Sequence, residues 1–389
     1  MNNIENFQLT YKRTWAEIDL DAIKSNFKKI KKVSNGKKVC CVIKANAYGH
    51  GAVQLAQVYQ KLGADLFAVA NIEEAVELRN NKIDKDILIL GYTPPICAKL
   101  LHDYNLSQCV YSFSYGKALH DMAEKTNVKV KIHIKIDTGM GRIGFLCLDE
   151  KKHGLKNAIR VCNMKNFNVE GIFTHFALAD NGENGKEFTM SQYSKFLFAK
   201  KFLIDYGISF KYSHCSNSAG ILNFSGLEEN TVRAGIVLYG MYPSNNIISQ
   251  VNFTPAMTLK SIVINVKDIE KGQSVGYGRK FIAGQKTRIA TIPIGYADGF
   301  FRADYFDNRQ VLINGQSAPV VGKVCMDQIM VDVTNISCHV NSEVVIFGKQ
   351  KGFTPDDIAK NLKTISYEIT CAVGLRVPRI YLENGKIVG

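Results

Sequence analysis

Short apolar runs alternate with amphipathic segments along the first 240 residues of the chain. The runs are rich in Val, Ile and Leu, and the segments between them carry apolar residues at helical spacing. The eight runs cover residues 39–45, 66–70, 86–92, 108–113, 128–137, 169–177, 211–217 and 231–240. Strands that alternate with helices predict parallel βα units, and eight units in succession favour an α/β fold with a closed (β/α)8 barrel of the TIM type. An open doubly wound sheet would give the same pattern and remains the alternative.

The pattern changes after Tyr242. From about residue 255 onward, apolar and polar residues alternate with a period of two, and Gly and Asn separate the runs. Helical spacing returns only near residues 356–362. This predicts a second, mostly antiparallel β domain, with 1–245 as the barrel and 246–389 as the β domain. The first twelve or so residues are expected to be able to pack with the β domain.

Composition indicates a globular protein of the cytoplasm. Of the 389 residues, 46% are hydrophobic and 22% are charged, and no apolar segment has the length of a signal peptide or a membrane span. The ten cysteines are scattered, mostly within apolar runs, and none forms a CxxC pair. They are therefore expected to be reduced and buried, with no metal site and no membrane partner.

The net charge of +14 raises the question of a nucleic-acid partner. The lysines are spread over the whole length, and the densest cluster, residues 28–32, continues a helical segment whose apolar positions are Ile23, Phe27 and Ile30. A solvated helix face explains this cluster better than a phosphate-binding patch, so no nucleic acid is expected to bind.

Lys44 follows a strand that is predicted to be buried on both faces. The run Val39–Ile43 is uninterrupted and apolar, and a small polar turn with glycines comes directly after the lysine. A lysine in this place either points into water or presents an amine to a carbonyl group. The second role requires a rigid, partly desolvated position, which the end of a buried strand provides.

The ends of the other predicted strands carry further polar side chains, and active sites of barrels lie at these ends. They are Tyr48, Lys135, Asp137, Arg142, His175, His214, Asn217, Ser218 and Arg233. In the fifth run Lys131, His133, Lys135 and Asp137 share one face, which predicts a hydrophilic mouth unless the lysines reach out to water. The sequences SNSAG and RAGI offer hydroxyl and amide donors for a phosphate. With a reactive lysine, these features indicate pyridoxal 5′-phosphate held as a Schiff base.

Ten motifs spread over nearly the whole chain resemble, in order, the motif series of bacterial alanine racemase. They are VIKANAYGHG, KIDTGMGRIG, THFA, HCSNSAG, VRAGIVLYG, VGYGRKF, IPIGYADG, VCMDQIMVDVT, SYEITC and RVPRIY. The resemblance implies an N-terminal barrel, a C-terminal β domain and a homodimer with shared active sites. It also implies interconversion of L-alanine and D-alanine by two bases, which supplies D-alanine for peptidoglycan.

The resemblance assigns roles to individual residues. Lys44 would bind the cofactor and act as one base, and Tyr277 of the partner subunit would act as the other. Arg233 would face the pyridine nitrogen, supported by His175. The residues implied for the phosphate are Tyr48, Ser218, Gly235, Ile236 and Tyr367, and Asn217 is also implied for cofactor binding. Those implied for the substrate are Arg142, Met326 and Tyr296. Lys135 occupies a position where many members carry a carbamylated lysine.

Three other functions fit parts of the pattern. A non-catalytic cofactor-binding protein can use the same barrel, but it would lack the β domain that carries Tyr277. A barrel-type amino-acid decarboxylase would take a catalytic cysteine from the partner, and Cys325 is the candidate for that role. A racemase of broader specificity is the third alternative, although members of that kind are often exported.

Overall fold

The computed structural model describes residues 13–147, 152–224, 226–302 and 309–388. Residues 24–238 and 242–252 form one compact unit, the barrel unit, and the remaining described residues form a second, the β unit. The predicted packing of the first twelve residues lies outside the described residues. The boundary between residues 245 and 246 remains a prediction.

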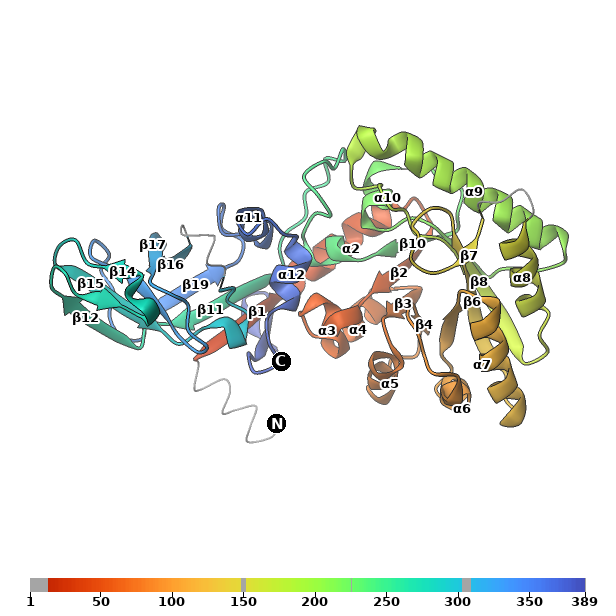
Figure 1. Ribbon diagram of the computed structural model, residues 1–389, viewed down its shortest axis with the longest axis horizontal. Coiled ribbons are helices and arrows are strands. Elements are labelled where there is room, and N and C mark those ends of the chain that lie inside the picture. The colour runs from red at the N-terminus through yellow and green to blue at the C-terminus, as the bar shows by residue number, and fades with distance from the viewer. Residues whose placement is uncertain (1–12, 148–151, 225, 303–308, 389) are drawn as a thin grey trace. The chain divides into compact units, whose positions relative to one another are not determined.

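Eight parallel strands close the barrel unit, which confirms the barrel prediction and makes the open-sheet alternative wrong (Figure 1). Their spatial order is β5-β4-β3-β2-β10-β9-β8-β6, and β5 pairs with β6 to complete the ring. The strands are β2 (Lys38–Val42), β3 (Leu66–Val69), β4 (Asp86–Ile89), β5 (Ser107–Val110), β6 (Val130–Asp137), β8 (Phe167–Phe173), β9 (Tyr212–His214) and β10 (Thr231–Ala234). The apolar runs became strands because they are covered on both faces: all four side chains of β3 are buried.

Helices connect the strands at the spacing that the sequence predicted. They are α2 (Leu20–Val33), α3 (Lys44–Tyr48), α4 (Ala52–Lys61), α5 (Ile72–Asn80), α6 (Ala98–Asp103), α7 (Phe113–Lys125), α8 (His153–Cys162), α9 (Lys186–Asp205) and α10 (Ser218–Asn223). A short strand, β7 (Phe145–Leu146), pairs with the end of β6. Side-chain caps begin some of the helices: Asn71 accepts from the backbone N–H of Glu74, and Ser112 accepts from that of Tyr115.

The β unit contains a ten-stranded sheet and a two-stranded hairpin. The sheet is formed by β1 (Thr14–Asp19), β11 (Met257–Ile262), β12 (Asn265–Ile269), β15 (Thr287–Ile292), β16 (Gln310–Ile313), β17 (Gln316–Val321), β18 (Ile329–Asp332), β19 (Glu343–Phe347), β20 (Arg379–Glu383) and β21 (Lys386–Ile387). The hairpin joins β13 (Ser274–Val275) and β14 (Phe281–Ile282), and two short helices follow β19, α11 (Pro355–Asn361) and α12 (Ser366–Cys371). Among the described strands of this unit, only β1 and β20 pair in parallel, so the antiparallel prediction is confirmed.

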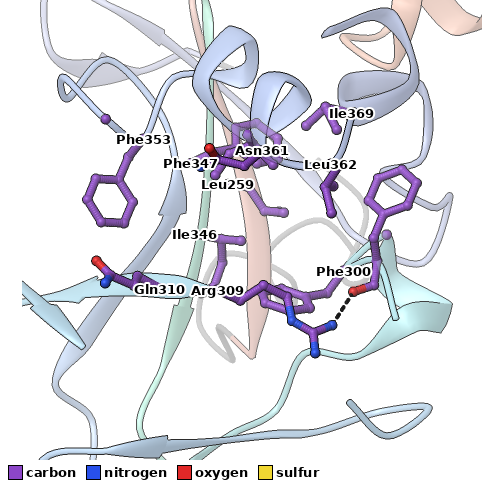
Figure 2. Close-up of a pocket in the computed structure, with 14 residues that line it drawn as sticks. Leu259, Phe300, Arg309, Gln310, Ile346, Phe347, Phe353, Asn361, Leu362 and Ile369 are labelled. Carbon is purple, nitrogen blue, oxygen red and sulfur yellow. Dashed lines mark hydrogen bonds between the residues drawn. The ribbon is translucent and has the colours of Figure 1, made fainter. Parts of the chain in front are cut away.

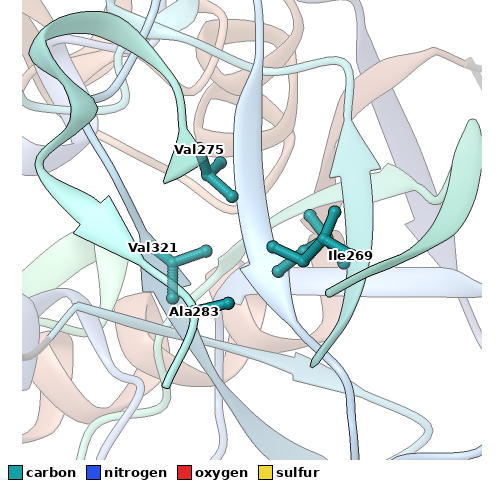
Figure 3. Close-up of a cluster of buried hydrophobic side chains, with 5 residues drawn as sticks. Ile269, Val275, Ala283 and Val321 are labelled. Atoms are coloured by element: carbon teal, nitrogen blue, oxygen red, sulfur yellow. The ribbon is translucent and has the colours of Figure 1, made fainter. Parts of the chain in front are cut away.

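The β unit contains an apolar cluster and a cavity. Ile269, Val275, Ala283 and Val321 pack with Ile289 into an apolar cluster beside the hairpin (Figure 3). A cavity of about 370 Å³ is lined mainly by apolar side chains, including Phe300, Phe347 and Leu362 (Figure 2). None of the residues predicted for the functional site lines this cavity, so the site has to be sought elsewhere.

Candidate functional site

Lys44 stands at the end of β2, which lies between β3 and β10 in the barrel wall. The short element α3 that follows is a left-handed turn and not a right-handed α-helix: the φ angles of Ala45, Asn46, Ala47 and Tyr48 lie between 50° and 54°. For residues that carry a Cβ atom this conformation costs roughly 1–2 kcal/mol each. Strain of this kind is typical of functional sites and has to be offset by surrounding contacts. The turn places both Lys44 and Tyr48 at the carboxyl end of β2.

Tyr48, Ser218 and Gly235 converge on one point. The backbone N–H of Gly235 donates to Ser218 Oγ over 3.0 Å. A Cβ atom added to Gly235 would lie 2.9 Å from the hydroxyl oxygen of Tyr48 and 3.5 Å from Ser218 Oγ. The glycine therefore leaves space beside two hydroxyl groups, and this arrangement of small donors fits a phosphate group. Ile236, which follows Gly235, is buried at the same place.

Asn217 has a structural contact beside this point. Its side-chain oxygen accepts a hydrogen bond from the backbone N–H of Gly220 over 2.9 Å and caps α10. The cap fixes the position of Ser218, the first residue of the helix. A direct contact of Asn217 with a phosphate remains a prediction.

Arg233 on β10 is buried, and its partners are neutral. The guanidinium donates to the carbonyl oxygens of Thr174, His214 and Cys215 at 2.8–3.1 Å. It also lies 2.8 Å from His214 Nδ1 and 3.2 Å from His175 Nδ1. No carboxylate among the described residues lies within ion-pair distance of Arg233, and a buried cation of this kind is suited to an uncharged or anionic acceptor.

The contacts of Arg233 determine the tautomers of the histidines. A guanidinium has no acceptor, so the Nδ1 atoms that face it, on His175 and His214, are unprotonated. His214 then carries its proton on Nε2, which lies 3.2 Å from His133 Nδ1. Burial and the charge of Arg233 lower the pKa values of His175 and His214 well below the usual range, and burial lowers the pKa of His133 to about 3. The three rings are therefore neutral at physiological pH.

Sequence reasoning left His214 without a role and noticed His133 only as part of a polar face. That face is buried inside the barrel and is not confined to its mouth. Lys131 lies 3.2 Å from a carboxylate oxygen of Glu170 and 3.7 Å from one of Asp86, and His133 lies between Lys131 and Lys135 on the strand. The alternation of the fifth run was the signal that could have identified His133.

Lys135 is buried and its Nζ lies 5.6 Å from the ring centroid of Phe173. Burial lowers the pKa of Lys135 to about 8, and the charges of Arg142 and Arg233 act in the same direction. No carboxylate of the described chain lies within ion-pair distance of this amine. A buried amine that loses its proton easily is suited to react with carbon dioxide, because only the neutral form is nucleophilic. Carbamylation of Lys135 remains a prediction.

Lys135→Met should stabilise the protein below pH 8 in buffer free of carbon dioxide. The pKa rises from about 8 in the folded chain to 10.5 in the unfolded chain. Below pH 8 both states are protonated and the folded state bears the full cost of the buried charge, about 3 kcal/mol. Between these two pH values the folded state loses its proton first, so the cost disappears as pH rises. Thermal unfolding from pH 7 to 10.5 should show a gain in melting temperature for the variant that vanishes at high pH.

Bicarbonate provides the control for this series. A carbamate on Lys135 would be an anion beside Arg142 and would stabilise the parent protein without affecting the methionine variant. The advantage of the variant should therefore shrink when bicarbonate is added at pH 8. A variant that is less stable than the parent at pH 7 without carbon dioxide would contradict the assignment of a buried cation.

The remaining predicted residues lie in the β unit. Tyr277 is 67% exposed and begins the turn between β13 and β14, flanked by Gly276 and Gly278, whose φ angles are 73° and 68°. Tyr296 donates its backbone N–H to the carbonyl of Cys325 over 3.1 Å, next to Met326. Tyr296 and Met326 are 41% and 53% exposed, so their side chains are available for contacts. Tyr367, in α12, is partly buried.

Asp298 fixes the turn that carries Tyr296, and sequence reasoning did not identify it. Its carboxylate is fully buried and accepts from the backbone N–H of Gly295 over 2.9 Å and from Arg376 Nε over 2.8 Å. Arg13 forms a second ion pair with the same carboxylate. Arg376 also contacts Asp327, the residue after Met326, over 2.6 Å. Arg376 thus links the buried carboxylate of Asp298 to Asp327 and joins the two turns.

The barrel unit gathers four basic groups around His175. Burial is the main cause of the low pKa of this ring, and the charges of Arg233, Arg142, Lys135 and Lys44 lower the pKa further, in that order. Within the described ranges no cluster of His, Cys, Asp and Glu could hold a metal ion. No helix in the described part of the chain is both long and apolar enough to cross a membrane. These basic groups, together with the hydroxyl groups of Tyr48 and Ser218 beside Gly235 (the phosphate corner), can bind an anionic compound.

Comparison with known proteins gives matches over both units. Residues 18–243 match the family model for the N-terminal domain of alanine racemase, and residues 256–381 match the model for its C-terminal domain. The alanine racemase of Clostridium tetani is 42% identical over 379 residues, which cover 96% of this chain and 97% of the relative. A solved alanine racemase from Clostridium difficile 630 has a TM-score of 0.91 at 42% identity, covering 97% of this chain and 98% of that one. The structure from Bacillus anthracis with bound L-Ala-P has a TM-score of 0.90 at 34% identity, covering 97% of both chains.

Proposed function

The chain is an isomerase that belongs to the alanine racemase family, and we propose from this premise that it interconverts L-alanine and D-alanine with pyridoxal 5′-phosphate as cofactor. The observation that supports the cofactor best is Arg233. Its buried guanidinium, which lies among neutral histidines, suits the ring nitrogen of this cofactor. The same barrel carries Lys44 and the phosphate corner, which suits the phosphate group.

The cofactor, when bound, would supply an aldehyde group that reacts with amines and a ring that can accept electron density. Lys44 would hold the cofactor covalently through Nζ. Arg233 would donate to the ring nitrogen and, because a guanidinium keeps its proton, would leave that nitrogen unprotonated. This limits the electron withdrawal and disfavours side reactions such as transamination. Tyr48, Ser218 and the backbone of Gly235 and Ile236 bind the phosphate, together with Tyr367.

Two bases on opposite faces of Cα move the proton. Lys44 Nζ removes or returns the Cα proton of D-alanine. The hydroxyl of Tyr277 from a partner subunit removes or returns the Cα proton of L-alanine on the opposite face. Exposure of 67% supports the assignment of Tyr277, because a base that serves another chain has to project from its own. Arg142 and the backbone N–H of Met326 bind the substrate carboxylate, and Tyr296 shapes the entrance.

The proposal includes a homodimer in the cytoplasm that supplies D-alanine for peptidoglycan. Seven of the ten cysteines are buried as predicted, whereas Cys97 and Cys325 are partly exposed and Cys371 is exposed, so the prediction of burial is wrong for these three. The decarboxylase alternative depended on Cys325, whose Sγ lies 3.7 Å from the carbonyl oxygen of Lys323. The family matches over both domains favour the racemase.

Isotope exchange tests the proposed function directly. The protein purified with its cofactor is incubated with each alanine enantiomer in deuterium oxide, and both should incorporate deuterium at Cα and invert. Release of carbon dioxide would indicate a decarboxylase, and a protein that keeps the yellow absorbance of the cofactor without exchanging either enantiomer would be a binding protein. Equal rates with larger amino acids would favour the broader racemase.

A further inference from the structure

The left-handed turn after Lys44 is held partly by hydrogen bonds within the segment: the backbone N–H of Ala47 donates to the carbonyl oxygen of Ile43, and that of Gly49 donates to the carbonyl oxygen of Ala45, both over 2.9 Å. Ala45, Asn46, Ala47 and Tyr48 all carry a Cβ atom, and L residues adopt four successive positive φ angles only where the surroundings impose them. Within the segment, Asn46 contributes: its side-chain oxygen accepts from the backbone N–H of Ala52 over 2.8 Å, at the start of α4. None of these three hydrogen bonds uses the backbone N–H of Ala45, the residue next to the lysine.

Glu74 holds that residue from a different βα unit. One carboxylate oxygen accepts from the backbone N–H of Ala45 over 2.6 Å, and the other accepts from the backbone N–H of Ala70 over 2.7 Å. Ala70 follows β3, the strand that pairs with β2. Glu74 is itself fixed, because its backbone N–H donates to the side chain of Asn71 over 2.9 Å at the start of α5. One carboxylate thus joins the ends of two neighbouring barrel strands.

We propose that Glu74 is a positioning residue of the active site, which holds the strained turn and thereby sets the positions of Lys44 and Tyr48. Hydrogen bonds to a carboxylate are roughly twice as strong as those between neutral groups, and here both oxygens are used. Without them Ala45 can return to a right-handed conformation, which would redirect the chain between the lysine and the tyrosine. The functional part of this inference rests on the proposed role of Lys44.

The test compares Glu74→Gln and Glu74→Ala with Glu73→Gln. The glutamine variant keeps one acceptor and turns an amide donor toward one of the two backbone N–H groups, so one of the two hydrogen bonds is lost. Glu73 is the matched control, because it lies in the same first turn of α5 and is exposed. Its substitution removes the same charge from the same helix end. All three proteins are studied with and without added pyridoxal phosphate.

Three measurements report on the conformation of the turn and on the reactivity of Lys44. Hydrogen exchange at the Ala45 amide should accelerate about tenfold or more in both Glu74 variants, with or without cofactor, and should not change in Glu73→Gln. Labelling of Lys44 by pyridoxal phosphate and borohydride should slow. The kcat for alanine should fall about 10–100-fold, as expected for a displacement near 1 Å, while KM stays close to that of the parent because Arg142 is untouched.

Each outcome decides the inference. Unchanged exchange at Ala45 in a folded Glu74→Ala protein overturns it, and so does an equal acceleration in Glu73→Gln. Faster exchange with unchanged labelling and kcat also overturns it, since Glu74 would then stabilise the turn without positioning the lysine. If the alanine variant does not fold, the glutamine variant decides. The exchange measurement does not require racemase activity, so a failure of the proposed function would be recognised separately.

Discussion

Lys44→Ala should lose essentially all racemisation. General-base contributions alone are worth roughly 10²–10⁴-fold. The same substitution also removes the covalent anchor of the cofactor, so we expect the rate to fall by at least the upper end of this range. Initial rates with both alanine enantiomers measure the loss. Borohydride reduction followed by peptide mapping should place the pyridoxyl group on Lys44 in the parent protein.

The peptide mapping distinguishes Lys44 from a second lysine that could carry the label. Lys135 lies in the same barrel, is buried, and has a pKa lowered to about 8, so its amine is also available to an aldehyde. A pyridoxyl label on Lys135 would show that the wrong amine was assigned. Lys61→Ala, at the exposed end of α4, is the matched control and should keep full activity and full labelling of Lys44.

Barrel strands such as β3 could be predicted because they are buried on both faces, which leaves a continuous apolar run in the sequence, whereas β6 was recognised by its alternation of apolar and polar residues. Strand β1 was missed for a physical reason. Its partners lie at the other end of the chain: Thr14 is opposite Ser261, and Ala16 is opposite Arg379. A strand whose partners lie so far away in the chain carries no local signal of the sheet to which it belongs.

Only the site residues that lie at predicted strand ends or within motifs could be predicted from the sequence. Positions such as Lys44 and Arg233 follow from the ends of predicted strands, but the chain from Arg233 through His214 to His133 requires the spatial order of the strands. The left-handed turn could not be predicted either, because residues 45–48 contain no glycine, the residue that usually indicates positive φ angles. Its anchor, Glu74, belongs to another βα unit and lies outside the ten quoted motifs.

Tyr277→Phe should affect the two half-reactions unequally. The substitution deletes the hydroxyl that serves the face of L-alanine, while Lys44 still binds the cofactor and still reaches the opposite face. Exchange of the Cα proton of L-alanine with solvent deuterium, and overall racemisation, should fall by roughly 10²–10⁴-fold. Exchange from D-alanine and the absorbance of the bound cofactor should be retained. Equal retention of both exchanges would mean that one base serves both faces.

Mixing the two inactive proteins tests whether Tyr277 acts across the dimer. In a mixed dimer of Lys44→Ala and Tyr277→Phe chains, one site carries both substitutions and the other carries neither, because each site takes its lysine and its tyrosine from different chains. Statistical exchange of subunits in an equal mixture should therefore restore about one quarter of the parent activity. If each site were built from a single chain, every site would keep one substitution and mixing would restore nothing. The recovery should appear at the rate of subunit exchange, which separates it from contamination by parent protein.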